Sequence, residues 1–371
     1  MTFLLASSAV CAPGPPEPGW VAIDDGLIID RGSGPPPISA LDAGSALLAP
    51  GLIDLQVNGV DDDDFATADA AGWRRAARAQ LERGVTAFCP TLVTAPLDRY
   101  DDALEHVSAA RHDLAGAPLP SVLGVHLEGP FLGGAPGAHP VDLVRAVDLA
   151  WLRHLLAAFP DVVTIVTLAP EADPGLAATR FLSDRGVTVA LGHSTATYDE
   201  VHAAADAGAR LVTHLFNGMA PLHHREPGLA GAALEDERLT PTLIADLVHV
   251  HPAALRLAIA HKRNVALVTD RVATVGLRVS EDGTARLADG TIAGSTLTMD
   301  GAVRNVVATG VAVERAIEMA TVIPAGALGL TDRGRLAPGT RADIVAFDPA
   351  SLAVRAVWLT GELAFGAPTG G

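Results

Sequence analysis

Cysteine is almost absent from this chain, whose 371 residues include only Cys11 and Cys89. Two cysteines cannot build a disulfide framework or a thiolate metal site, so their scarcity predicts a protein of the reducing cytoplasm. The first ten residues also lack the basic segment with which a signal peptide begins. No apolar run reaches the roughly 18 residues that span a bilayer, so the sequence predicts no membrane association.

Aromatic residues make up only 4% of the chain, although 49% of its residues are hydrophobic. Ala, Val and Leu supply most of that fraction, which suits a close-packed α/β interior and argues against disorder. Positive charge is also scarce, because 26 Lys and Arg stand against 43 Asp and Glu, a formal net charge of −17. This charge disfavours a nucleic-acid or anionic-membrane partner, and an anionic substrate would need a local positive site.

The middle of the chain alternates strand and helix patterns. Ala-rich stretches with helical spacing occupy 70–83, 143–158 and 198–207. The β-branched, strand-like runs are 51–55, 85–89, 122–126, 162–168, 187–191, 211–214, 242–246 and 265–270. Strands of this kind that alternate with helices indicate parallel pairing with both faces covered. Eight repeats in about 220 residues predict the α/β class and a (β/α)8 barrel of the TIM type.

The two ends of the chain have a different composition. Residues 1–48 are rich in Pro and Gly with short β-type runs, and similar runs recur at 339–347 and 353–359. Neither end is long enough to bury a core alone. We therefore predict a small β-sandwich domain formed by residues 1–48 and 335–371, beside a barrel domain of residues 49–334.

A carboxylate and two imidazoles stand at the ends of three predicted strands: Glu128, His193 and His214. In a barrel, the carboxyl ends of the strands meet at one mouth. One carboxylate and two imidazoles form a three-ligand set for a zinc-like divalent ion, with a fourth position open to water. A single histidine in such a place is usually structural, but the repeated context favours a metal site.

Two further polar residues suit hydrolysis of a phosphorylated substrate. Asp270 ends the last predicted strand, where it could take a proton from water and return it to a leaving amine; alone, it would also suit a helix N-cap. Arg225 precedes a Pro-Gly turn and suits bidentate phosphate binding, with a surface ion pair as the alternative. The acidic run 61–64 is interpreted as a solvated loop.

Nine segments, in order and with ordinary spacing, resemble the N-acetylglucosamine-6-phosphate deacetylase family of the amidohydrolase superfamily. The string Arg-Glu-Pro-Gly-Leu-Ala-Gly at 225–231 is the most specific of them. The segments are 50–59, 126–131, 192–197, 213–217, 225–231, 244–249, 267–270, 293–299 and 319–321.

The resemblance implies hydrolysis of N-acetyl-D-glucosamine 6-phosphate to D-glucosamine 6-phosphate and acetate, a step of amino-sugar catabolism, by a homodimer. It makes Glu128, His193 and His214 the metal ligands. It makes Asp270 the general base and acid, and His139 a donor to the acetyl oxygen. The implied substrate-binding residues, in part supplied by a second subunit, are Gln56, Ala138, His139, Asn217, Gly218, Arg225, His249, Ile292, Ala293 and Gly294.

The first predicted strand bears on the metal count. It carries Gln56-Val-Asn58, whereas many amidohydrolases have His-x-His there and bind a second metal. Amide side chains are weak ligands for a zinc-like ion. The sequence therefore resembles the branch with one divalent ion per chain, zinc first, with iron, manganese and cobalt as alternatives. Gly218 and Arg271 depart from the family pattern, and Arg271 adds a bulky positive charge at the mouth.

Three alternatives stay open at this stage. N-acetylgalactosamine 6-phosphate would undergo the same chemistry, because nothing in the sequence distinguishes the epimers at C4 of the sugar. A cyclic-amide hydrolase would need a bridging carboxylated lysine, and the single lysine, Lys262, follows a helical pattern. A catalytically inactive barrel is disfavoured, because all four chemical positions are filled.

Overall fold

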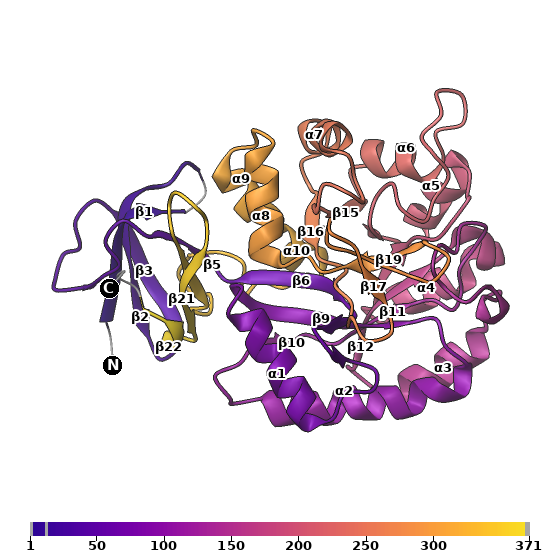
Figure 1. Cartoon of the computed structure of the whole chain (residues 1–371), viewed down its shortest axis with the longest axis horizontal. Coiled ribbons are helices and arrows are strands. Elements are labelled where there is room, and N and C mark those ends of the chain that lie inside the picture. Colours follow the sequence, from indigo (N-terminus) through magenta and orange to yellow (C-terminus); the bar gives the residue numbers. More distant parts are fainter. Residues whose placement is uncertain (1–2, 12–13, 368–371) are drawn as a thin grey trace.

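The computed structural model describes residues 3–11 and 14–367. Parallel strands form the nearly closed barrel that the alternating pattern predicted (Figure 1). Asp270 N donates to Gln56 O at 2.9 Å, so the segment after the last strand closes the barrel against the first. The strands are β6 (Leu52–Val57), β9 (Val85–Val93), β10 (Ser121–Val122), β11 (Val125–Glu128), β12 (Val163–Leu168), β13 (Thr188–Leu191), β14 (Leu211–Val212), β15 (Thr240–Ile244) and β16 (Ala266–Val268).

The third barrel strand differs from its prediction at 122–126, because Gly124 interrupts it. Gly124 has φ +136°, and a Cβ there would lie 1.9 Å from Thr164 Oγ1. The strand is therefore divided into β10 and β11, and Glu128 is the last residue of β11. The runs predicted to end at His214 and Asp270 are also shorter, since β14 and β16 end two residues earlier.

Helices surround the barrel, and two of the three predicted ones match within two residues. The helix predicted at 143–158 begins only at Leu149, because Asp148 caps it by accepting from Trp151 N at 2.9 Å. No helix in the described part of the chain is long and apolar enough to cross a membrane. The helices are α1 (Ala70–Leu81), α2 (Tyr100–Leu114), α3 (Leu149–Ala158), α4 (Ala177–Ser183), α5 (Tyr198–Asp206), α6 (Gly228–Glu235), α7 (Pro252–His261), α8 (Met299–Ala308), α9 (Val313–Met319) and α10 (Val322–Ala327).

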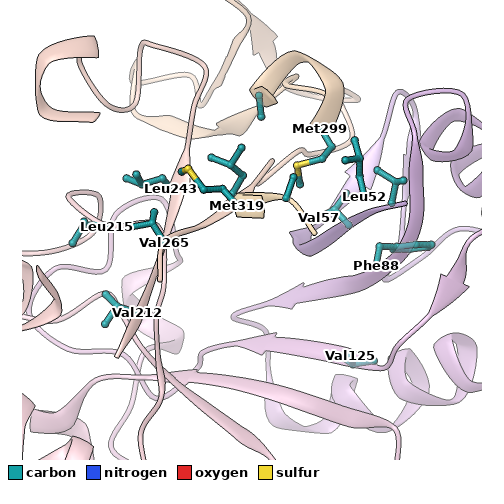
Figure 2. Packing of buried hydrophobic residues seen from close by; sticks show 14 of the residues in the cluster. Leu52, Val57, Phe88, Val125, Val212, Leu215, Leu243, Val265, Met299 and Met319 are labelled. Atoms are coloured by element: carbon teal, nitrogen blue, oxygen red, sulfur yellow. The ribbon is translucent and has the colours of Figure 1, made fainter. Parts of the chain in front are cut away.

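The barrel is packed on both faces of its strands, and all six residues of β6 are buried. Inside the barrel, Leu55, Ile165 and Ile244 belong to one apolar cluster. Between strands and helices lies a larger cluster that includes Leu243 and Met319 (Figure 2). Two-sided burial explains why the strands read as continuous apolar runs.

Strands from both ends of the chain form the flanking β-structure, beside the barrel (Figure 1). Val21 and Trp358 lie in different parts of one sheet yet share a core, so the sheet packs against itself as a sandwich does. The boundaries at 48/49 and 334/335 stay a prediction. The strands are β1 (Phe3–Val10), β2 (Glu17–Asp24), β3 (Leu27–Ser33), β4 (Leu41–Asp42), β5 (Leu47–Pro50), β20 (Ile344–Phe347), β21 (Val354–Leu359) and β22 (Glu362–Gly366).

Two small sheets lie near the mouth of the barrel. One is a hairpin of β7 (Gly59–Val60) and β8 (Asp63–Asp64), which follows β6. The other joins β17 (Arg278–Val279), β18 (Thr284–Arg286) and β19 (Ile292–Ser295) in an insertion between β16 and α8. An isolated bridge between Arg271 and Ser295 ties this insertion to the closing strand.

Candidate active site

A cavity of about 810 Å³ opens at the carboxyl ends of the barrel strands, where TIM barrels hold their active sites. Its wall contains all four residues predicted to carry the chemistry: Glu128, His193, His214 and Asp270. It also contains most of the predicted substrate-binding residues, namely Ala138, His139, Asn217, Gly218, His249, Ile292, Ala293 and Gly294.

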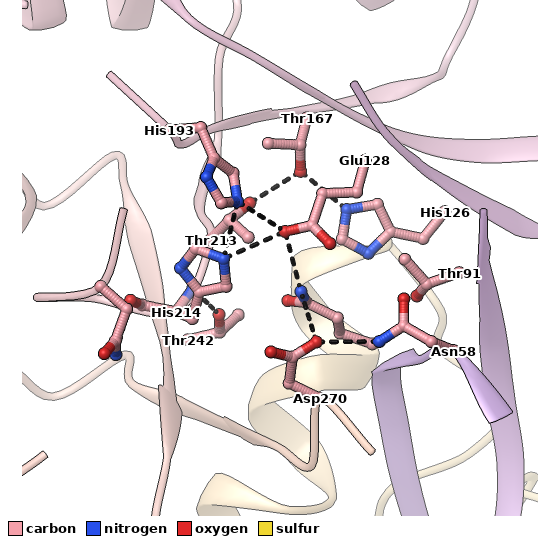
Figure 3. Close-up of polar contacts among 12 residues, drawn as sticks. Asn58, Thr91, His126, Glu128, Thr167, His193, Thr213, His214, Thr242 and Asp270 are labelled. Atoms are coloured by element: carbon pink, nitrogen blue, oxygen red, sulfur yellow. Dashed lines mark hydrogen bonds and ion pairs between the residues drawn. The ribbon is translucent and has the colours of Figure 1, made fainter. Parts of the chain in front are cut away.

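Glu128, His193 and His214 meet in a tight triangle (Figure 3). Glu128 Oε1 lies 3.1 Å from His193 Nε2 and 3.0 Å from His214 Nε2, and the two Nε2 atoms are 3.0 Å apart. All three side chains are buried. Burial alone would raise the pKa of Glu128, but its contacts with the two imidazoles hold it well below its usual range.

The donor set of this triangle fits a divalent cation. His193 Nδ1 lies 3.3 Å from Ala135 O, a carbonyl that can only accept, so Nδ1 carries the proton and Nε2 keeps a lone pair. That lone pair faces a carboxylate oxygen and a second imidazole nitrogen at hydrogen-bond distance. A cation among these three atoms could accept a lone pair from each of them, and a carboxylate with two imidazoles is a common ligand set for zinc.

His139 lies beside this triangle, and its ring centroid is 4.4 Å from that of His193. Potential ligand atoms of Glu128, His139 and His193 all lie within 4.8 Å of one another, so the geometry suits metal ligation as well as the predicted donor role. Burial lowers the pKa of His139 to about 4, so the ring is neutral. Its Nδ1 is buried and has no protein partner within the described residues.

One amide, that of Gln56, joins Asp270 to the triangle, and the amide of Asn58 also donates to Asp270 (Figure 3). Gln56 Nε2 donates to Glu128 Oε1 at 3.0 Å and to Asp270 Oδ1 at 3.2 Å, and Asn58 Nδ2 donates to Asp270 Oδ1 at 2.9 Å. Burial and the charge of Glu128 raise the pKa of Asp270 to about 6. The carboxylate is therefore ionised at neutral pH and more basic than an ordinary one.

The backbone is strained at these positions. His193, His214 and Asp270 have φ values of +50°, +29° and +48°, a left-handed region that non-glycine residues rarely adopt. Gly218 allows the next turn to approach, since a Cβ there would lie 2.7 Å from His193 Nδ1. The departure of Gly218 from the family pattern thus has a steric explanation in this chain.

A polar network surrounds His126, for which the sequence predicted no role. His126 Nε2 is 2.7 Å from Thr167 Oγ1, which is 2.7 Å from Thr213 Oγ1. His126 Nδ1 contacts Leu55 O at 3.0 Å. Burial lowers the pKa of His126 to about 4, so this ring is neutral. The sequence did contain a signal for this residue. His126 lies two positions before Glu128, and residues two apart on a strand face the same side.

Asp246 is a second residue that the sequence analysis left without a role. Its Oδ2 lies 2.6 Å from His249 Nδ1, and its Oδ1 accepts the backbone N–H of His249 at 2.8 Å. Burial alone would raise the pKa of Asp246, but the His249 hydrogen bond and charge lower it overall. The Asp246 carboxylate thus fixes the orientation of the His249 ring at the cavity wall.

Two predicted substrate-binding residues lie elsewhere. Gln56 does not line the cavity, because its amide is engaged with the two carboxylates. Arg225 is exposed, contacts His224 Nε2 at 2.8 Å and does not line the cavity of its own chain.

The cavity wall is acidic. It contains Asp62, Asp64, Glu128 and Asp270, and no Lys or Arg of the described residues. The run 61–64 is largely exposed, as predicted, yet Asp62 and Asp64 also border the cavity. The Arg271 guanidinium turns to Asp61, which it contacts at 2.5 Å, and does not line the wall.

A sequence model of the amidohydrolase family matches residues 47–368. The chain belongs to the amidohydrolase family. The match spans the barrel and the C-terminal part of the flanking sheet, as the resemblance implied.

Curated relatives of this amidohydrolase are sugar-phosphate deacetylases. The N-acetylgalactosamine-6-phosphate deacetylase of Escherichia coli O157:H7 is 40% identical over 94% of this chain and 96% of its own length. The N-acetylglucosamine-6-phosphate deacetylase of Bos taurus is 42% identical over 87% of this chain and 84% of its own length.

Solved structures resemble this amidohydrolase over almost the whole chain. A mutant N-acetyl-D-glucosamine-6-phosphate deacetylase of Mycobacterium smegmatis, in complex with N-acetyl-D-glucosamine 6-phosphate, superposes with a TM-score of 0.90 and 37% identity. That match covers 98% of this chain and 99% of the other. The N-acetylglucosamine-6-phosphate deacetylase of Pasteurella multocida gives a TM-score of 0.89 at 26% identity, with the same coverage.

The single lysine of this amidohydrolase lies outside the site. Lys262 Nζ donates to Asp236 O at 2.6 Å and does not line the cavity. Lys262 therefore cannot form a carboxylated bridge between two metal ions in this site. A cyclic-amide hydrolase was predicted to need such a lysine, so this alternative is disfavoured.

Proposed function

We propose that this amidohydrolase hydrolyses N-acetyl-D-glucosamine 6-phosphate to D-glucosamine 6-phosphate and acetate. The observation that carries the proposal is the buried triangle of Glu128, His193 and His214 next to Asp270, in the wall of one cavity. The names of the relatives supply the substrate class, a phosphorylated N-acetyl amino sugar.

We propose one divalent ion per chain, held by Glu128, His193 and His214. Zinc is the first choice, with iron, manganese and cobalt as alternatives. When bound, the ion supplies Lewis-acid polarisation of the substrate carbonyl and of the attacking water. The amide nitrogens of Gln56 and Asn58, which donate to carboxylates, support a single ion, because a second would need ligands there.

The protein residues move the protons. Asp270 takes a proton from the water that attacks the acetyl carbon, and its pKa of about 6 suits this role at neutral pH. His139, whose neutral ring carries one N–H, donates it to the acetyl oxygen as negative charge develops there. Asp270 then protonates the sugar nitrogen as the carbon–nitrogen bond breaks, which releases acetate and the free amine.

The remaining wall residues hold the sugar in this proposal. Asn217 and His249, which have polar side chains, line the cavity, and Ala138, Gly218 and the 292–294 segment would contribute backbone contacts. The phosphate, however, needs a cation that the wall of one chain does not supply. We therefore propose a homodimer in which Arg225 of the partner subunit reaches the phosphate.

We place the reaction in the cytoplasm, where phosphorylated sugars are metabolised. Both cysteines are free, buried thiols, which suits a reducing compartment. The net charge of −17 supports a small molecule, and neither a nucleic acid nor a membrane, as the partner of the enzyme.

Steady-state kinetics on four sugars test the proposal: the N-acetylated glucosamine and galactosamine 6-phosphates and their dephosphorylated forms. We expect the highest kcat/KM for N-acetyl-D-glucosamine 6-phosphate, with acetate released and about one metal ion per chain. A preference for the galactosamine ester would support the second candidate, which the Escherichia coli relative favours. Absence of acetate from all four sugars, with metal bound, would refute the deacetylase assignment.

A further inference from the structure

Glu171 links two segments that border the active site, although the mechanism gives it no role. It lies in the 3₁₀ turn Pro170–Ala172, directly after β12, the strand between those that lead to Glu128 and His193. Its Oε1 accepts from Thr195 N at 2.7 Å and from Gly134 N at 3.2 Å, and its Oε2 accepts from Ser194 Oγ at 2.6 Å. One carboxylate thereby joins residues 60 positions apart in the sequence.

The glycines of the 133–134 segment allow this approach. A Cβ on Gly133 would lie 1.9 Å from Glu171 Oε1, and a Cβ on Gly134 would lie 2.5 Å from Thr195 Oγ1. Gly133 N also donates to His193 O at 2.8 Å. The segment therefore packs directly on the turn that carries the metal-binding imidazole, and any side chain would push the two apart.

The same segment continues to two groups of the active site. Ala135 O is the partner of His193 Nδ1 at 3.3 Å, which leaves His193 Nε2 as the ligand atom. His139, four residues later, lines the cavity. On the other side of the carboxylate, Ser194 directly follows His193 and is fully buried. Glu171 thus contacts both the residue next to His193 and the segment that orients its ring.

We propose that Glu171 is a positioning residue for the metal site: its carboxylate holds His193 and the segment that leads to His139 in one geometry. The inference concerns metal retention and rests on the proposed metal site, but it does not depend on which sugar is hydrolysed. Residues that orient metal ligands typically contribute 10- to 100-fold in metal affinity or activity.

The test measures metal affinity by competition with a chelator, on the full-length enzyme loaded with zinc. Glu171→Ala removes both carboxylate oxygens that accept hydrogen bonds from Gly134, Ser194 and Thr195. We therefore expect zinc affinity to fall by about 10- to 100-fold. Glu171→Gln keeps one acceptor oxygen and should lose less. Excess zinc should restore much of the kcat of both variants, with little change in KM. Glu105→Gln, at an exposed glutamate of α2, is the matched control and should behave as wild type.

A double-mutant cycle with Ser194→Ala sharpens the result. Both changes interrupt the same contact, so their effects on zinc affinity should be less than additive. Unchanged zinc affinity in Glu171→Ala would overturn the proposal. Failure of the proposed substrate would leave the zinc measurements intact, so the two failures are distinguishable.

Discussion

The proposed metal-binding residues and the proposed phosphate ligand lie in differently built parts of the molecule. Glu128, His193 and His214 are buried, hydrogen-bonded to one another and supplied by strand ends of one chain. Arg225, the predicted phosphate ligand, lies exposed on a loop outside the cavity, whose wall has no Lys or Arg in the described part of the chain. In the proposed mechanism, one barrel supplies all three metal ligands. The phosphate needs a cation that the cavity wall of the same chain does not supply.

Polar residues recur at a regular distance after the barrel strands, which brings the proposed metal ligands and Asp270 to one edge. β13, β14, β15 and β16 end at 191, 212, 244 and 268, and the polar residues His193, His214, Asp246 and Asp270 each follow two residues later. Parallel strands present such positions side by side at one edge. Loop residues have no comparable register, so sequence spacing does not place their side chains.

The largest expected effect concerns the metal-binding part. His193→Ala and His214→Ala should each abolish both metal binding and activity, because two remaining ligands hold a zinc-like ion poorly. Elemental analysis and kcat measure the result, with His112→Ala on the surface of α2 as the control. Two tightly bound ions per chain in the wild type, both required for turnover, would contradict the one-metal interpretation.

Asp270→Asn separates proton transfer from metal binding. The amide cannot take the proton of water, so kcat should fall by about 10²- to 10⁴-fold, and metal content should stay at the wild-type level. A variant that retains more than about a tenth of the wild-type kcat would show that another group is the base.

Arg225→Ala addresses the phosphate-binding part. KM for the phosphorylated sugar should rise by about 10- to 150-fold, from the loss of about 1.5–3 kcal/mol of charge-assisted contact. KM for the dephosphorylated sugar should hardly change. Equal losses on both substrates would make Arg225 structural.

Mixing the Arg225→Ala and Asp270→Asn variants, assayed at a substrate concentration far below the raised KM of Arg225→Ala, tests which subunit supplies the cation for the phosphate. If Arg225 acts across a homodimer, reassociated Arg225→Ala and Asp270→Asn chains form mixed dimers with one intact site. About a quarter of wild-type activity should then return, since half of the dimers are mixed. No recovery, with mixed dimers verified, would place Arg225 in the site of its own chain.

The smallest effect is on stability and concerns Asp54, which accepts from Thr269 Oγ1 on the closing segment at 2.6 Å. Burial raises the pKa of Asp54 to about 7. The folded chain keeps this proton up to about pH 7, whereas an unfolded aspartate loses it near pH 4. Wild-type stability should therefore fall as pH rises through this window. Asp54→Asn should gain about 2–3 kcal/mol relative to wild type between pH 5 and pH 8, measured by urea unfolding. A constant difference would contradict the buried-acid interpretation.

The sequence by itself determined the barrel and the chemistry at its mouth. Runs that are apolar on both faces, repeated eight times, leave few architectures open, and a polar residue just beyond such a run must lie at the mouth. Glu128, His193, His214 and Asp270 were therefore predictable from local pattern, and the family resemblance supplied the substrate class.

Only the tertiary structure decided which groups surround those four. The contacts of Glu171 with the backbone of Gly134 and of Asp246 with the ring of His249 depend on loop paths, and no local periodicity encodes those paths. The same holds for Arg225, since its exposed position follows from the fold of a loop and not from the residue type. The positions of the strands follow from which residues are buried, and the apolar pattern of the sequence shows this. Loop geometry also depends on contacts between distant segments, which no local pattern shows.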